Sequence, residues 1–104
     1  MSMNPHRYAH EKVGAAISWL MLPDVEFERR LLGAMAELEV AFHSTPPAPS
    51  AAGHVGRIKR IIGAEQWREH ARRLTPSERS ELVNTFWDLD RAISRDYYTF
   101  DARL

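Results

Sequence analysis

Two histidines near the start of the chain have a spacing that could bind a metal ion. His6 and His10 are four residues apart, so on a helix they would share one face, with Glu11 beside them. Zinc needs a third and usually a fourth ligand, and the other three histidines are scattered along the chain. We therefore expect surface histidines here, and neither a metal site nor a cofactor.

The carboxylates and hydroxyls do not form a recognisable catalytic set. Asp88 and Asp90 would point about 200° apart on a helix, so they would not converge on one substrate. No serine lies in a G-x-S-x-G nucleophile turn. The chain has no cysteine, which excludes a thiol nucleophile and a disulfide framework. We expect no catalytic residues and a protein that is not an enzyme.

Charge is balanced over the whole chain but is unevenly distributed along it. Residues 54–74 hold six basic and two acidic side chains, whereas residues 24–42 hold five acidic and two basic ones. Either the basic segment packs beside the acidic one, or it contacts an anionic partner such as nucleic-acid phosphates. The zero net charge makes a duplex-binding role the second choice. The basic candidates for partner binding are Arg57, Lys59, Arg60, Arg68 and Arg72.

Aromatic residues provide a second set of candidates for partner binding. The chain has three Trp, three Tyr and four Phe. Trp19 lies off the main apolar stripe of its segment, and Tyr97 and Tyr98 crowd the C-terminal end. Aromatic side chains and arginines are the usual anchors of protein interfaces. The alternative is that these rings cap the core of a helical bundle.

The first part of the chain has the pattern of two helices. Asn4 is a good N-cap and Pro5 suits the first helical position, so a first helix begins there and ends at Pro23. This helix has a second apolar side, so it is either central in its bundle or contacts something outside it. Asp24 caps a second helix, whose apolar stripe runs over residues 27–42. Gly33 within that stripe favours a close approach of the two helices, which form an antiparallel hairpin.

A proline-rich break separates the two halves of the chain. Residues 44–53 contain three prolines within four positions, which cannot lie inside a helix. After this linker the apolar pattern predicts a short helix near 54–62, a C-cap at Gly63 and a longer helix near 64–74.

The last helix has the clearest start signal. Thr75-Pro76-Ser77-Glu78 is a capping box with proline at the first helical position. Its apolar residues then recur at helical spacing up to residue 93. For the aromatic segment 97–100, continued helix competes with extended or irregular structure.

These elements predict an all-α fold. We expect a single domain over residues 1–104: a compact bundle of four main helices in two hairpins, with a short extra helix after the linker 44–53. The longest fully apolar stretch is far shorter than the roughly 20 residues that span a bilayer. The N-terminus also lacks the apolar core of a signal peptide. We therefore expect a cytoplasmic protein without a membrane partner.

Composition and pattern favour a role in protein binding. We expect a small non-enzymatic protein–protein interaction module: an inhibitor, an adaptor or a regulatory subunit. Small inhibitors of host defence encoded by phages or mobile elements have a similar profile, which is an analogy only. The alternative is a nucleic-acid-binding regulator that uses residues 57–73. The expected partner is a protein, with self-association left open.

Overall fold

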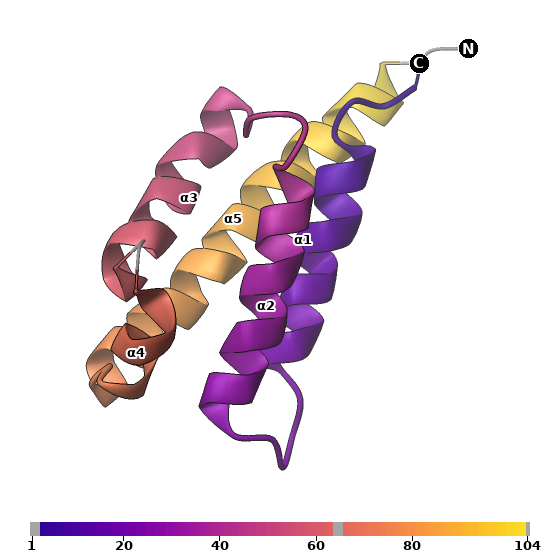
Figure 1. Cartoon of the computed structure of the whole chain (residues 1–104). Coiled ribbons are helices and arrows are strands. Elements are labelled where there is room, and N and C mark those ends of the chain that lie inside the picture. Colours follow the sequence, from indigo (N-terminus) through magenta and orange to yellow (C-terminus); the bar gives the residue numbers. More distant parts are fainter. Residues whose placement is uncertain (1–2, 64–65, 104) are drawn as a thin grey trace.

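The computed structural model describes residues 3–63 and 66–103, which form five helices (Figure 1). No strand occurs among these residues, which confirms the all-α prediction. The helices are α1 (Arg7–Leu20), α2 (Phe27–Ala41), α3 (Pro49–Ile62), α4 (Trp67–Arg72) and α5 (Pro76–Ala102).

The four longer helices form two pairs. α1 and α2 pack as an antiparallel hairpin, and α3 packs on α5 (Figure 1). α5 joins the pairs because it also packs on α1, while the short α4 crosses to α2. In the part of the chain that the structure describes, the backbones of α2 and α3 do not approach each other closely. This arrangement matches the predicted bundle of two hairpins.

The start of α1 differs slightly from the prediction. The Oδ1 atom of Asn4 accepts a hydrogen bond from the backbone amide of His6 at 2.9 Å, as an N-cap does. A turn follows, and the regular helix begins only at Arg7. The Nδ2 atom of Asn4 also donates to the backbone oxygen of Tyr97 and to a carboxylate oxygen of Asp101, each at 2.9 Å. Asn4 therefore fastens the start of α1 to the end of α5.

Asp24 does not cap the second helix, so that prediction was wrong. α2 begins at Phe27, and Glu26 at its N-cap position makes no side-chain cap bond. Asp24 lies in the preceding loop with a left-handed φ of 59°. Asp is one of the few residues other than glycine that adopt this conformation readily. The residue therefore helps the chain to reverse between the two helices.

The linker is shorter than the predicted 44–53, because α3 already begins at Pro49. A proline at the first helical position loses no hydrogen bond, since that amide has no partner within the helix. The amides of Ala51 and Ala52 both donate to the backbone oxygen of Ala48 at 2.9 Å. The Ala51 side chain is buried. Pro46 and Pro47 lie in the linker, whereas Pro49 starts a helix.

The short extra helix is α4, with six residues, and α3 is a main helix of fourteen. The sequence predicted the opposite order of lengths, with the shorter helix near 54–62. Gly63 ends α3 with a left-handed φ of 66°, as predicted. The predicted start of the later helix at residue 64 lies outside the described residues.

The start of α5 confirms the predicted capping box. The Glu78 amide donates to Thr75 Oγ1 at 3.1 Å, and the Thr75 amide donates to Glu78 Oε1 at 3.0 Å. This bond from the Thr75 amide lowers the pKa of Glu78 below its ordinary value, because it favours the charged carboxylate. The helix continues through the aromatic segment 97–100 to Ala102, so the helical alternative was right.

The core lies where the two helix pairs meet. Its one buried polar side chain among the described residues is Thr85, whose hydroxyl donates to the backbone oxygen of Glu81 at 2.7 Å. The largest fully buried side chains come from α1, α2, α3 and α5. They are Val13, Leu31, Ile58, Ile62, Leu82, Thr85, Phe86 and Leu89.

Candidate functional site

The outer surface of the α1–α2 hairpin exposes several large apolar side chains. Tyr8 is 52% exposed, Trp19 40%, Leu22 39% and Val40 42%. Leu32 of α2 is exposed to a similar extent. We call this surface the hairpin face. It is formed by Tyr8, Lys12, Ala15, Trp19, Leu22, Gly33, Glu37 and Val40.

The sequence of α1 explains why this helix has two apolar sides. The core side carries the buried Val13, Ile17 and Leu20. Positions 8, 12, 15 and 19 alternate steps of four and three, which keeps them on one other side of the helix, and Leu22 follows in the turn after α1. This second side is exposed, so α1 is not enclosed on all sides within the bundle.

Trp19 connects the two helices of the hairpin face. Its indole ring lies on Gly33 of α2, so that a Cβ added at position 33 would be 2.6 Å from Trp19 Cε2. Ala15, Trp19 and Leu22 also border one shallow hollow. The close approach expected at Gly33 is therefore made by the ring of Trp19.

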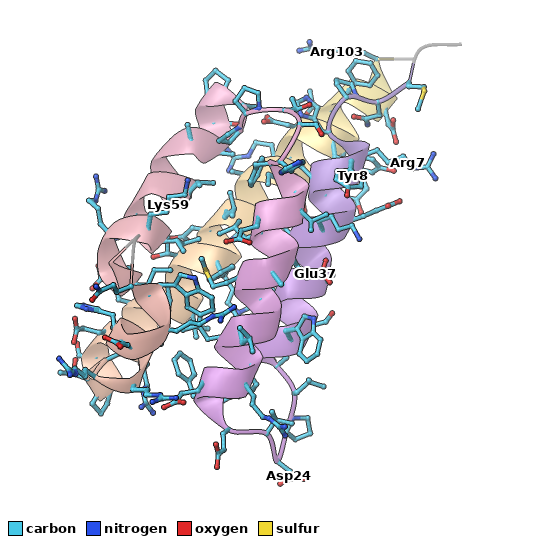
Figure 2. The ribbon with its side chains drawn as sticks, viewed as in Figure 1. Arg7, Tyr8, Asp24, Glu37, Lys59 and Arg103 are labelled. Atoms are coloured by element: carbon cyan, nitrogen blue, oxygen red, sulfur yellow. The ribbon has the colours of Figure 1, made fainter. Side chains whose placement is uncertain are left out.

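A pair of charges lies between the apolar ends of the hairpin face. Lys12 Nζ of α1 is 3.8 Å from Glu37 Oε2 of α2, and both side chains are partly exposed. Lys12 Nζ also lies 5.7 Å from the centre of the Tyr8 ring. Tyr8 and Val40 line a second hollow beyond this pair. Figure 2 shows Tyr8 and Glu37 on the hairpin side of the molecule, away from Lys59 on α3.

The basic candidates are spread over several directions. Arg57 makes an ion pair with Glu81 of α5 at 2.9 Å, and Arg72 makes one with Glu28 of α2 at 3.4 Å. Arg57 and Lys59 are two residues apart on α3, so they are rotated by about 200° around the helix and point to nearly opposite sides. The structure does not bring the basic residues together as one stripe.

The other two basic candidates are surface residues of α3 and α4. Arg60 is exposed on α3. Arg68 is exposed on α4, and its guanidinium lies 5.6 Å from the centre of the Trp67 ring. A guanidinium over an indole face makes a cation–π contact, so Arg68 is held beside its own helix.

The C-terminal tyrosines pack on α1. Tyr97 stacks on His10 with ring centres 4.3 Å apart and an interplanar angle of 5°. Tyr98 meets both rings edge-on and is itself 61% exposed. The structure therefore gives Tyr97 a contact within the chain, and it leaves most of Tyr98 accessible.

The described parts of the chain contain no group of three or more His, Asp or Glu side chains placed to hold a metal ion. Among the same residues, no helix combines the length and apolarity that crossing a membrane requires.

A cleft between α2 and α3 was not foreseen from the sequence. It has a volume of about 640 Å³, with Lys59 among its lining residues. Its apolar lining residues include Met35, Leu38, Val55 and Ile62, all of which are buried. Other apolar residues of the lining are not buried, so part of the apolar wall of the cleft is accessible: Phe42, Pro46, Pro47 and Trp67.

The eight candidates of the sequence analysis lie in three separate places: on the hairpin face, on α3 and α4, and at the end of α5. Sequence reasoning missed Leu22 and Val40, although Val40 lies off the apolar stripe of α2 and so could have been noticed. No protein-family model matches the chain, and no match was found among curated proteins or solved structures. The function must therefore be argued from these surfaces.

Proposed function

We propose that the chain is a small non-enzymatic protein-binding module, such as an inhibitor, an adaptor or a regulatory subunit, and that it binds through the hairpin face. The observation that supports this is the exposure of Tyr8, Trp19, Leu22 and Val40 on one surface. The apolar residues form two clusters, one on each side of the Lys12–Glu37 pair. Exposed apolar patches on a soluble domain are commonly interaction sites. Tyrosine and tryptophan are also the side chains most often found at the energetic centre of an interface.

Two features of the hairpin face suit it to tight contact. Tyr8 and Trp19 together leave roughly 200 Å² of surface exposed, and at about 25 cal/mol per Å² its burial contributes about 5 kcal/mol before the cost of association. The ring of Trp19 is already held against Gly33. A side chain that is fixed before binding loses less conformational entropy when a partner docks.

The alternative function, nucleic-acid binding through residues 57–73, has less support. Arg57 pairs with Glu81 and Arg72 pairs with Glu28 within the fold. Only the second pair joins the basic segment to the acidic segment 24–42, as the packing interpretation of the charge pattern expects. Lys59, Arg60 and Arg68 remain as the residues through which a phosphate backbone would be contacted.

Two matched triple variants test the proposal. The face variant carries Tyr8→Asp, Leu22→Asp and Val40→Asp. The basic variant carries Lys59→Glu, Arg60→Glu and Arg68→Glu. Each replaces three exposed side chains and leaves the buried core unchanged. Circular dichroism first establishes that both variants keep the helical fold.

Wild-type chain and both variants are then used to capture partners from nuclease-treated extracts of the native host. We expect wild type and the basic variant to retain the same stoichiometric protein, and the face variant to lose it. The opposite result would contradict the proposal: duplex DNA binding that weakens with salt, is lost in the basic variant and persists in the face variant.

A further inference from the structure

We propose that a second copy of this chain binds the hairpin face, so that two hairpins pack face to face around a two-fold axis parallel to α1 and α2. This inference rests on the proposed function, because it names an occupant for the same surface. A symmetric interface must be complementary to itself. The hairpin face meets this condition through its charges and through its helix directions.

The charges favour one of the two simple symmetric arrangements. Lys12 and Glu37 lie side by side between the two helices, nearer to Tyr8 than to Leu22. An axis parallel to the helices places α1 opposite α2 of the partner subunit. Lys12 then faces Glu37 of the partner subunit, and Glu37 faces Lys12 of the partner subunit. An axis across the helices at the level of this pair would instead place Lys12 opposite Lys12 of the partner subunit, and like charges oppose association.

The helix directions are compatible with this arrangement, as they also are with an axis across the helices. α1 and α2 are antiparallel within one chain (Figure 1). Rotation about an axis parallel to them keeps the direction of each helix, so α1 is also antiparallel to α2 of the partner subunit. The four helices then have antiparallel neighbours on every side, which is the usual arrangement of a four-helix bundle. Tyr8 and Val40 border the same hollow, so Tyr8 packs opposite Val40 of the partner subunit.

The size of the face sets the expected strength of association. From residue 8 to residue 22 the face is about 21 Å long, and two packed helices are about 19 Å wide. This gives a footprint of roughly 400 Å² per copy, or about 800 Å² in total, which is smaller than a standard stable interface and typical of weak, transient contacts. We therefore expect a dimer dissociation constant on the order of 10–100 µM. α3, α4 and the cleft between α2 and α3 lie outside this footprint and stay accessible.

Charge reversal provides the decisive experiment. Lys12→Glu makes both charged positions of the face acidic, and Glu37→Lys makes both basic. Each variant alone therefore places like charges opposite each other across the axis, whereas an equimolar mixture pairs acidic positions with basic ones in a mixed dimer. Sedimentation equilibrium over a range of concentrations measures self-association of wild type, of each variant and of the mixture. Arg91→Glu is the matched control, because it makes the same charge change and breaks an exposed ion pair on α5.

We expect wild type and Arg91→Glu to dimerise with the same dissociation constant. Lys12→Glu and Glu37→Lys should each dimerise at least about tenfold more weakly, and their mixture should recover the wild-type dissociation constant. A chain that stays monomeric up to about 1 mM, or a mixture that remains as weak as its components, would overturn the inference. The proposed function is judged separately by partner capture. A monomeric chain that still captures a different protein through Tyr8, Leu22 and Val40 refutes the second copy and leaves the protein-binding role intact.

Discussion

The indole ring of Trp19 occupies the space in which a side chain at position 33 would begin. Three ring carbons lie within 2.6 Å of the place where a Cβ on Gly33 would be. Trp19 and Gly33 belong to different helices, so this contact determines how α1 and α2 meet on their exposed side. Glycine is required here for space, since its φ is not left-handed.

Gly33→Ala is expected to destabilise the protein even though alanine is the better helix former. The replacement gains about 1 kcal/mol of helix propensity, but the displaced Trp19 ring costs more, so we expect a net loss of about 1–3 kcal/mol. Gly14→Ala is the control, because nothing lies within 4 Å of a Cβ there, and it is expected to stabilise by about 0.5–1 kcal/mol. Urea unfolding measures both changes. In a Trp19→Ala background the penalty for Gly33→Ala should disappear, and a penalty that persists would refute the contact.

Two adjacent leucines of α2 test the assignment of the core. Leu31 is fully buried, whereas Leu32 is 44% exposed. Leu31→Ala is expected to cost about 2–5 kcal/mol, because it leaves a cavity in the core. Leu32→Ala should cost less than about 1 kcal/mol. If chemical denaturation shows the same loss of unfolding free energy for both variants, α2 is rotated about its axis relative to this structure.

The capping box predicts a specific effect of pH. Because the pKa of Glu78 is lower in the folded chain than its ordinary value, its charged form stabilises the fold above that ordinary value. This contribution is lost as the pH falls through the folded pKa. Glu78→Gln should therefore reduce the loss of stability on acidification, whereas Glu39→Gln, at an exposed position on α2, serves as the comparison. Thermal unfolding at a series of pH values between neutral and acidic measures the difference.

The same box gives a prediction at neutral pH. Thr75→Ala removes the side-chain oxygen that accepts from the Glu78 amide, and we expect a loss of about 1 kcal/mol. Ser80→Ala, at an exposed position one turn further along α5, is the control and should be close to neutral. An unchanged unfolding midpoint for Thr75→Ala would contradict the assigned start of α5.

Two insertions distinguish the true linker from the start of α3. A Gly-Ser insertion between Ser44 and Thr45 lengthens an exposed loop and should cost about 0.5 kcal/mol or less. The same insertion between Ala51 and Ala52 lies inside α3. It rotates the buried Ala51 out of line with Val55 and Ile58 and should cost several kcal/mol. Similar thermal unfolding midpoints for the two insertions would show that α3 starts later than Pro49.

Sequence reasoning predicted the features that depend on local chemistry. The capping box at Thr75 and the end of α3 at Gly63 were both found, because each depends on the conformational preferences of a few adjacent residues. The apolar stripes also predicted the core faces of the long helices. These patterns were sufficient for the fold class.

The errors arise where a residue type suits two local roles. Asp24 is suited both to an N-cap and to a left-handed turn, and only the path of the chain back onto α1 selects the turn. Pro49 is suited both to a linker and to a helix start, and burial of the following Ala51 selects the helix. The hairpin face could not be assembled from sequence, because it combines residues of two helices whose relative rotation depends on the packing of Trp19 on Gly33.

The hydrogen bond from Asn4 to Tyr97 has a consequence for the order of folding. It joins residues 93 positions apart, whereas α1 and α2 are joined by a loop of only six residues. Closing a short loop costs less chain entropy than closing one that includes nearly the whole protein. Contacts between neighbours in sequence also favour rapid folding. We expect the α1–α2 hairpin to form early and transiently, with its core side still hydrated, and the junction at Asn4 to close among the last steps.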